Sequence, residues 1–292
     1  MHGIANTGLR DRPTEELATR IAALVLSKLR SCDTQNVCNV LWGLATYGSD
    51  EETPQAAALL QRQEVIDLFR AVDEQRAAAL LKEADESAIG QDISNLVWSF
   101  AKAGLPFPGV LAAMRDAFVS RPRTLKAFNG QHLTNTAWGI ATLGGGRGDA
   151  DTHTHTHHVL TAIAAEACDK PPRSVESFHL ATMAWAFAKS EHAVPWLFER
   201  IVREFEPRKV DARGLSQLVW AVSTSGFASK CPELFATLAQ VLPPRLHELS
   251  EQNLSMVAWG YANAEHWSEA ALFEHLGREM ESRLPRLTDK QL

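Results

Sequence analysis

The sequence predicts an all-α protein: an α-solenoid (superhelix) of stacked helical hairpins with about 38 residues per repeat. Two observations carry this prediction. A word centred on tryptophan recurs six times along the chain, and apolar residues at helical spacing form a second segment after most copies. The 292 residues are 45% hydrophobic, enough to bury a core. No apolar run approaches the ~18 residues of a membrane span.

The recurring word is rich in Ala, has few β-branched clusters and ends in Gly in four of its copies, as helices with a C′ glycine do. Its copies are spaced 56, 40, 47, 35 and 39 residues apart, measured between tryptophans. The copies are QNVCNVLWGLATYG (35–48), QDISNLVWSFAKAG (91–104), QHLTNTAWGIATLG (131–144), FHLATMAWAFAKSE (178–191), RGLSQLVWAVSTSG (213–226) and QNLSMVAWGYANAE (252–265).

The second helix of each hairpin is expected in the apolar-periodic segments that follow, several of which begin with Pro. Residues 1–30 then hold the second helix of a truncated preceding repeat, within 17–30. Residues 31–292 hold six Trp-containing repeats and part of a seventh, because LTDKQL (287–292) overlays LSEQNL (249–254). We therefore expect the chain to be part of a longer array.

Two insertions lengthen the first and third intervals. Residues 50–87 are expected to form one or two acidic amphipathic helices, and residues 49–90 carry a net charge of -6, as large as that of the whole chain. Residues 144–158, GGGRGDADTHTHTHH, are expected to form a Gly/His-rich loop. The histidines could bind a transition metal, but an adventitious binder without a fixed scaffold is the favoured interpretation, so no metal site is assigned.

On a helical wheel the aliphatic positions of the word form one broad arc, and the positions seven and three before Trp and four after it form a polar strip beside it. This strip has two interpretations: an inter-repeat hydrogen-bond ladder, or a row of amide and hydroxyl groups that bind unstacked RNA bases. Its candidate RNA-binding members are Gln35, Asn39, Gln91, Asn95, Lys102, Gln131, Asn135, Thr142, Lys189 and Gln217.

The residue after each Trp is small, so another group approaches the helix closely there; neighbouring helices could pack at this point. A basic residue also precedes five of the six words, often beside Pro. These bases could follow a phosphate backbone, or they could only complement the dipoles at helix C-termini. The candidates for phosphate contact are Arg123, Arg173, Arg208 and Arg245.

The motif Q-x-L-x-N-x-x-W-[GAS]-Φ-A-[TK]-x-G at this period resembles the octotricopeptide and heptatricopeptide repeats. It is also similar to the helical repeats of FAST-kinase-like and RAP-domain proteins and of a subunit of the kinetoplastid RNA-editing substrate-binding complex. The resemblance covers residues 30–292 and decays in the later copies, where Thr182, Gln217 and Met256 replace Asn. It implies an organellar RNA-binding solenoid that acts in RNA processing, in mRNA or rRNA stability, or in translation.

The resemblance further implies a mitochondrial or plastid location, although residues 1–17 are too acidic for a good mitochondrial presequence and lack the apolar stretch of a secretory signal. Single-stranded RNA is the expected partner, with RNA-processing proteins beside it, and neither a membrane nor a small-molecule substrate is expected. No Gly-rich phosphate loop, GxSxG or HExxH motif is found, so we expect no enzyme and no cofactor. The alternative is a protein-binding α-solenoid of the armadillo/HEAT kind.

Overall fold

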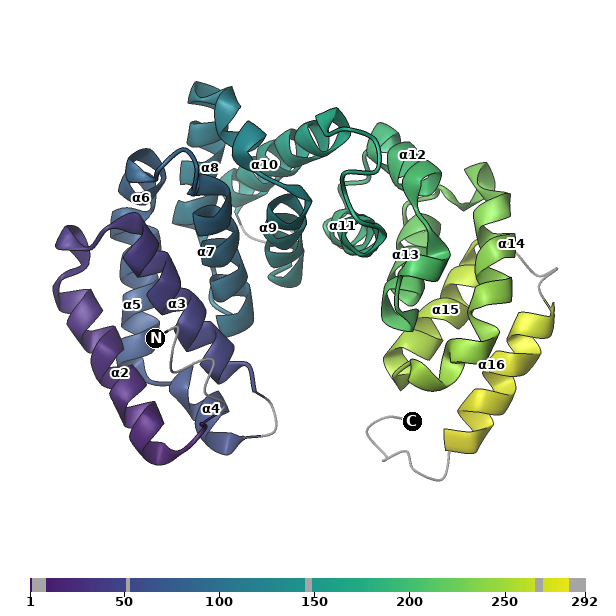
Figure 1. Ribbon diagram of the computed structural model, residues 1–292, viewed down its shortest axis with the longest axis horizontal. Coiled ribbons are helices and arrows are strands. Elements are labelled where there is room, and N and C mark those ends of the chain that lie inside the picture. The colour runs from purple at the N-terminus through teal and green to yellow at the C-terminus, as the bar shows by residue number, and fades with distance from the viewer. Residues whose placement is uncertain (2–8, 51–52, 145–148, 266–269, 284–292) are drawn as a thin grey trace. The chain divides into compact units, whose positions relative to one another are not determined.

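The computed structural model describes residue 1 and residues 9–50, 53–144, 149–265 and 270–283, and every regular element within them is helical (Figure 1). The all-α prediction is therefore confirmed. The chain divides into two compact units, Met1–Ala167 (unit 1) and Cys168–Leu292 (unit 2). None of the described helices combines the length and apolar character needed to cross a membrane.

Each tryptophan word lies on one helix, which we call an A helix. The six A helices are α3 (Thr34–Gly48), α7 (Ile89–Ala103), α9 (Gly130–Thr142), α11 (Ser177–Lys189), α13 (Ala212–Thr224) and α15 (Glu251–Asn263). The other helices, which we call B helices, are α2 (Arg12–Ser27), α4 (Pro54–Leu59), α5 (Gln63–Ala71), α6 (Ala77–Glu83), α8 (Pro108–Ser120), α10 (Ala150–Asp169), α12 (Pro195–Glu204), α14 (Pro232–Val241) and α16 (Ala270–Arg283).

Short turns lead into several A helices. These are the 3-10 helices η1 (Leu29–Ser31), η3 (Pro122–Ala127), η4 (Pro207–Lys209) and η6 (Pro243–Glu248), while η5 (Ala228–Lys230) joins α13 to α14. Proline opens three of the four turns that precede an A helix, because its fixed φ suits the first helical position and it has no N–H to satisfy.

The residue nine before Trp sets the start of most A helices. Asp33, Asn129, Asp211 and Ser250 each accept a hydrogen bond from the backbone N–H three residues on. These oxygens satisfy one of the free donors at a helix N-terminus. The capping residue of these A helices therefore lies two residues before the word, whose first residue is the Gln/Arg position of the polar strip.

The residue six after Trp follows most of the A helices in a left-handed conformation. Gly104 and Gly226 have φ of 67° and 73°, which confirms the expected C′ glycine in these two copies. Gly48 instead remains inside α3, so the expectation is wrong for the first copy. Glu191 and Glu265 adopt the same conformation with φ of 53° and 58°. A side chain in this region costs about 1 kcal/mol or more, so unit 2 closes two of its A helices with strain.

In unit 1, α3 packs beside α7 and α7 packs beside α9, while α2 contacts α5 and α6 contacts α8 (Figure 1). Two layers of helices thus enclose the core. Phe69 and Phe100 meet edge to face at 5.0 Å between ring centroids, which joins the two layers. Helix α2 begins at Arg12, five residues before the predicted segment, because Asp11 caps it.

The acidic insertion is helical, as expected, but it forms a single bent B element after α4. Helix α5 passes through a π-helical turn, η2 (Val72–Arg76), into α6. The turn directs two buried side chains to different neighbours. Asp73 accepts hydrogen bonds from the first N–H groups of α8, at Gly109 and Val110, and Arg76 reaches the η1 turn. A part of the charged insertion therefore connects repeats.

The second insertion differs from its prediction. Residues 150–158, expected to be a loop, form the first turns of α10, and residues 145–148 lie outside the described residues. The alternating His and Thr residues continue into the apolar periodicity of Val159, Leu160 and Ile163, all of which are buried. Because helix propagation costs little once a packed turn exists, tertiary packing extends the helix through this polar run.

Unit 2 repeats the same arrangement of A helices, with α11 beside α13 and α13 beside α15. Its core contains stacked Phe198 and Phe227 rings, 5.3 Å apart, and the pair Phe235–Tyr261. The Tyr261 hydroxyl donates a 2.7 Å hydrogen bond to the Phe235 carbonyl. Both units therefore bury the apolar arc that the wheel assigned to the core.

Candidate nucleic-acid interface

The small residue after Trp is where neighbouring A helices touch. A Cβ on Gly139 would lie 2.6 Å from Val97 Cγ1, and a Cβ on Gly260 would lie 2.6 Å from Val219 Cγ1. Val97 and Val219 each directly precede the Trp of the previous repeat. The expectation of helix packing at this position is confirmed for these two contacts, which leaves the Trp side chains beside the interface rather than inside it.

The tryptophans of unit 1 form a row across α3, α7 and α9. The Trp42 and Trp98 ring centroids are 6.4 Å apart, with ring planes inclined by 31°. Lys102 places its Nζ 5.8 Å from the Trp98 centroid and 5.6 Å from the Trp138 centroid. All three rings are half-buried, so part of each ring reaches solvent. We call Trp42, Trp98, Lys102 and Trp138 the aromatic row.

Amide side chains lie on the same helices, one and two turns before the aromatic row. Gln91 Nε2 donates to Asn95 Oδ1 at 2.7 Å, and Gln91 Oε1 lies 3.3 Å from His132 Nε2 on the next A helix. The inter-repeat ladder therefore exists at one step, through a histidine outside the predicted strip. Burial lowers the pKa of His132, which favours its neutral form.

The remaining strip amides of unit 1 hold no side-chain hydrogen bond within the described residues. They are Gln35 and Gln131, which are exposed, and Asn39 and Asn135, which are half-buried. Thr142 is exposed, but its hydroxyl donates to the Trp138 carbonyl at 2.8 Å. Most of the amide donors and acceptors that the sequence singled out in unit 1 are thus open to a ligand.

Unit 2 keeps less of the strip. Gln217 is buried at 8% exposure, so its predicted place on the open strip is wrong, because α13 turns this position into the helix packing. Lys189 is exposed, as predicted. Asn263 Nδ2 donates to the Ser223 carbonyl at 3.3 Å, and Ser223 Oγ donates to the Gly260 carbonyl at 2.7 Å. Hydrogen bonds of the ladder kind therefore join α13 to α15.

The arginines before the A helices divide into two groups. Arg123, Arg173 and Arg208 are exposed, and their guanidinium groups form no hydrogen bond or ion pair within the described residues. Arg245 is half-buried instead. Arg245 donates to the Val210 carbonyl at 2.6 Å and pairs with Glu248. The hydrogen bond from Arg245 to Glu248 is the main cause that lowers the pKa of this carboxyl. Arg245 therefore holds its own turn and is unsuited to its predicted contact with phosphate.

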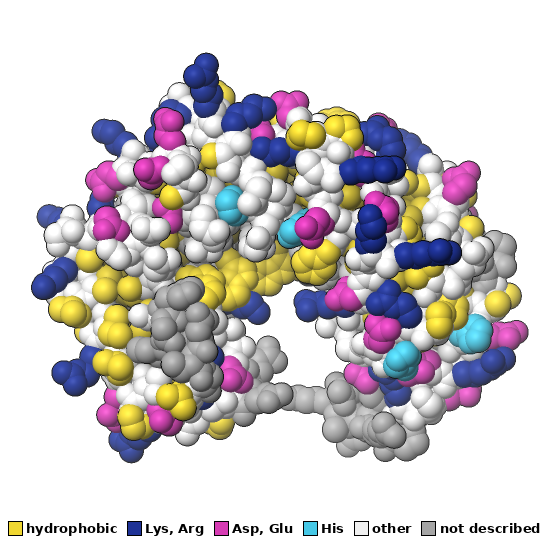
Figure 2. Space-filling view, in the orientation of Figure 1, with side chains coloured by type: hydrophobic (Ala, Val, Ile, Leu, Met, Phe, Trp, Pro, Cys, Tyr) yellow, Lys and Arg dark blue, Asp and Glu magenta, His cyan; other side chains and the backbone are white. Residues whose placement is uncertain are grey.

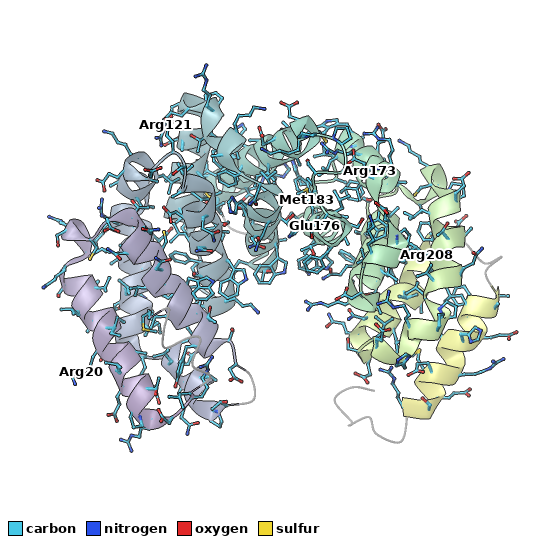
Figure 3. The ribbon with its side chains drawn as sticks, viewed as in Figure 1. Arg20, Arg121, Arg173, Glu176, Met183 and Arg208 are labelled. Atoms are coloured by element: carbon cyan, nitrogen blue, oxygen red, sulfur yellow. The ribbon has the colours of Figure 1, made fainter. Side chains whose placement is uncertain are left out.

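Arg173 and Arg208 lie in the part of unit 2 where basic side chains gather over α12 and α13 (Figures 2 and 3). Arg173 precedes α11 and Arg208 lies in η4. Acidic groups intervene, since Lys209 pairs with Glu206 at 2.9 Å and Asp211 caps α13. The surface is thus mixed in charge, with unpaired arginines that remain free to meet an anion.

The sequence did not predict a second set of arginines, on B helices, that hold the turns from inside. Arg76 donates to the Cys32 carbonyl, Arg200 to the Pro171 carbonyl and Arg283 to the Leu246 carbonyl. Each of these arginines also pairs with a carboxylate on its own chain segment, at Glu83, Glu204 and Glu279 respectively. The signal available in the sequence was an Arg and a Glu four residues apart, as at Arg200–Glu204 and Glu279–Arg283.

A buried carboxyl lies on α7, directly after Gln91. Asp92 is 5% exposed, and burial, followed by the charges of Asp33 and Asp85, raises its pKa to about 6. Burial also raises the pKa of the Cys38 thiol, which is close enough to feel the charge of Asp92. These groups lie inside unit 1 rather than on the polar strip.

The histidine run lies along α10. His153 and His157, one turn apart, have ring centroids 4.3 Å apart, and Arg115 Nη1 of α8 lies 2.8 Å from His155 Nε2. Among the described residues, no three His, Cys, Asp or Glu side chains converge into a group that could hold a metal ion. The run contributes a contact between α8 and α10.

No protein-family model matches the chain, and no curated protein matches it.

Proposed function

We propose that this chain is an RNA-binding helical-repeat adaptor, a solenoid that acts in mitochondrial or plastid RNA processing, in mRNA or rRNA stability, or in translation, without catalysis of its own. The observation that carries the proposal is the strip of unit 1. Its amides at Gln35, Asn39, Gln131 and Asn135 have no side-chain partner within the described residues, and they lie at the same two positions of their repeats, seven and three before Trp. Amides in such a row can hydrogen-bond the edges of unstacked bases.

The charge of the strip agrees with a polyanionic partner. In unit 1 its nine positions contain one lysine and no acid, although the whole chain carries a net charge of -6. Unpaired arginines at Arg123, Arg173 and Arg208 supply candidate phosphate contacts at the turns. The organelle and the process rest on the resemblance of the repeat word alone.

The proposal is tested with a triple charge reversal, Arg123→Glu, Arg173→Glu and Arg208→Glu, measured by fluorescence anisotropy on single-stranded RNA across a salt titration. We expect affinity to fall by about 100-fold or more, and the slope of log K against log salt to fall by about 2, since each lost phosphate contact on a single strand removes about 0.7. Crosslinking with mass spectrometry then maps the contacted residues.

A matched control carries the same change of charge on the B helices α2 and α16, as Arg12→Glu, Arg20→Glu and Arg278→Glu. These three arginines are exposed and lie on helices rather than in the turns (Figure 3 labels Arg20). The control variant should keep most of its affinity. Equal losses of affinity in both variants would mean that the net charge of the chain, and not the three turn arginines, determines RNA binding. If the folded wild-type chain bound no RNA at low salt, a protein-binding solenoid would be favoured instead.

A further inference from the structure

The three tryptophans of the aromatic row have no role in the proposed contacts of amides and arginines, yet all of them are partly exposed. A core spacer would bury its ring, whereas Trp42, Trp98 and Trp138 each keep part of the ring in solvent. They lie on adjacent helices and are linked by a ring contact at one step and by the Lys102 ammonium at the next. The row therefore places a partly exposed indole ring on each of three successive A helices.

Resting on the proposed RNA-binding function, we propose that the aromatic row of unit 1 is a base-stacking platform for single-stranded RNA. Its substrate is thus a strand whose bases are unpaired and unstacked. Indole faces stack on any nucleobase, because every base has a π face. The amides at Asn95 and Asn135, one turn before the Trp side chains, then lie where the edge of a stacked base would be.

Lys102 has a specific part in this proposal. Its ammonium occupies the space shared by the Trp98 and Trp138 rings, where it gains cation–π attraction. A base that stacks on either ring takes the place of this ammonium. The flexible side chain of the exposed Lys102 then moves the ammonium to a phosphate of the same strand, so an ion pair replaces the lost cation–π contact.

A cationic peptide fits this surface less well. None of the strip positions of unit 1 carries an acidic side chain to pair with such a peptide, and Asp92, the nearest acid in sequence to the strip, is buried. Planar, electron-poor bases joined by a negative backbone match aromatic faces, open amides and a lysine together. The charge balance therefore favours a nucleic-acid strand.

The test compares two probes of equal length on the intact chain: a fluorescently labelled oligouridylate, and the same sugar–phosphate strand without bases. Both probes offer the same phosphates, so their difference reports the bases. Stacking of one base on an aromatic side chain predicts that the oligouridylate binds at least about tenfold more tightly. Equal affinities would overturn the platform, and with it the base contacts of the strip amides, while leaving phosphate contacts by the arginines intact.

Substitutions then locate the platform. Trp98→Leu should remove the preference for the base-bearing strand, and Trp98→Phe, which keeps an aromatic face, should retain most of it. The matched control is Trp220→Leu at the same repeat position in unit 2, where no ring contact joins the tryptophan to another within the described residues. A preference lost equally in the control would overturn the assignment to unit 1.

Two further outcomes keep the test decisive. Circular dichroism melts establish whether Trp98→Leu folds, and equal affinities of the wild-type chain for the two probes would overturn the platform even if that variant does not fold. If the folded wild-type chain binds neither probe at low salt, both the platform and the proposed function are rejected.

Discussion

Units 1 and 2 build the same helical hairpin but join their A helices in different ways. In unit 1 an aromatic row links α3, α7 and α9, and most strip amides remain open. In unit 2 hydrogen bonds from Ser223 and Asn263 link α13 to α15, while Gln217 is buried. The difference teaches that one repeat word can either leave its polar side chains open to solvent or use them to pack neighbouring helices.

The charged interior sharpens this comparison. Unit 2 contains a nearly fully buried ion pair, Arg200–Glu204, that holds the turn before α11, whereas unit 1 contains buried carboxyls on α7 and on the π-helical turn. Each unit therefore has an electrostatic weakness of its own, and substitutions should affect one unit at a time. Hydrogen exchange read by mass spectrometry can assign each effect to its unit.

The largest effect is expected from Arg200→Met. It leaves the buried Glu204 carboxylate with the Arg173 N–H as its main remaining partner, and loss of one member of a buried pair costs about 3 kcal/mol or more. Hydrogen-exchange protection should fall in unit 2 and stay unchanged in unit 1. Arg203→Met on the same helix is the control, because Arg203 is exposed and its removal should cost about 0.5 kcal/mol or less.

An intermediate effect is expected from Gly139→Ala and Gly260→Ala, one in each unit. The added methyl meets the valine of the preceding A helix, and overpacking of this kind costs about 1–3 kcal/mol. Gly277→Ala on α16 is the control: nothing lies within 4 Å of its Cβ position, so the better helix former should stabilise by about 1 kcal/mol. Destabilisation in one unit alone would show that the shared contact is not equivalent.

The smallest effect is expected from Asp92→Asn in unit 1. The pKa of Asp92 is raised to about 6, so the folded chain holds this proton more tightly than the unfolded chain, whose carboxyl titrates near 3.8. The free energy of unfolding should therefore fall as pH rises from about 4 to about 6, and the substitution should recover about 1 kcal/mol at pH 7.5.

Chemical denaturation of wild type and Asp92→Asn at pH 4 and pH 7.5 checks this. The two proteins should differ at pH 7.5 and agree more closely at pH 4, where Asp92 is protonated in the folded state. A gain at pH 4 as large as at pH 7.5 would mean that burial of the carboxylate charge is not the cause.

Much of the fold was predictable because the word is strongly periodic. The apolar arc fixed which face of each A helix is buried, and the small residue after Trp indicated the close helix contact now seen at Gly139 and Gly260. The histidine run was not predictable as a helix, because its local composition favours a loop and only packing of the following Val159 and Leu160 extends α10 through it.

The candidate site was predictable only as a set of positions. The wheel placed Gln35, Asn39, Gln131 and Asn135 on one strip, and they are at least partly exposed. It placed Gln217 on the same strip, where packing buries it. The arginines before the A helices are equivalent in their place in the sequence, but not in the structure. Arg245 is held by Glu248 and the Val210 carbonyl, whereas Arg123 has no such contact within the described residues.

The sequence by itself determined the repeat, the helices and the buried face, because helix periodicity and capping act within a few residues along the chain. Only the tertiary structure decided which polar side chains stay open, which arginines hold turns, and that Lys102 reaches two tryptophan rings from different helices. These outcomes depend on distances between side chains far apart in sequence, and such distances are set when the helices pack against one another.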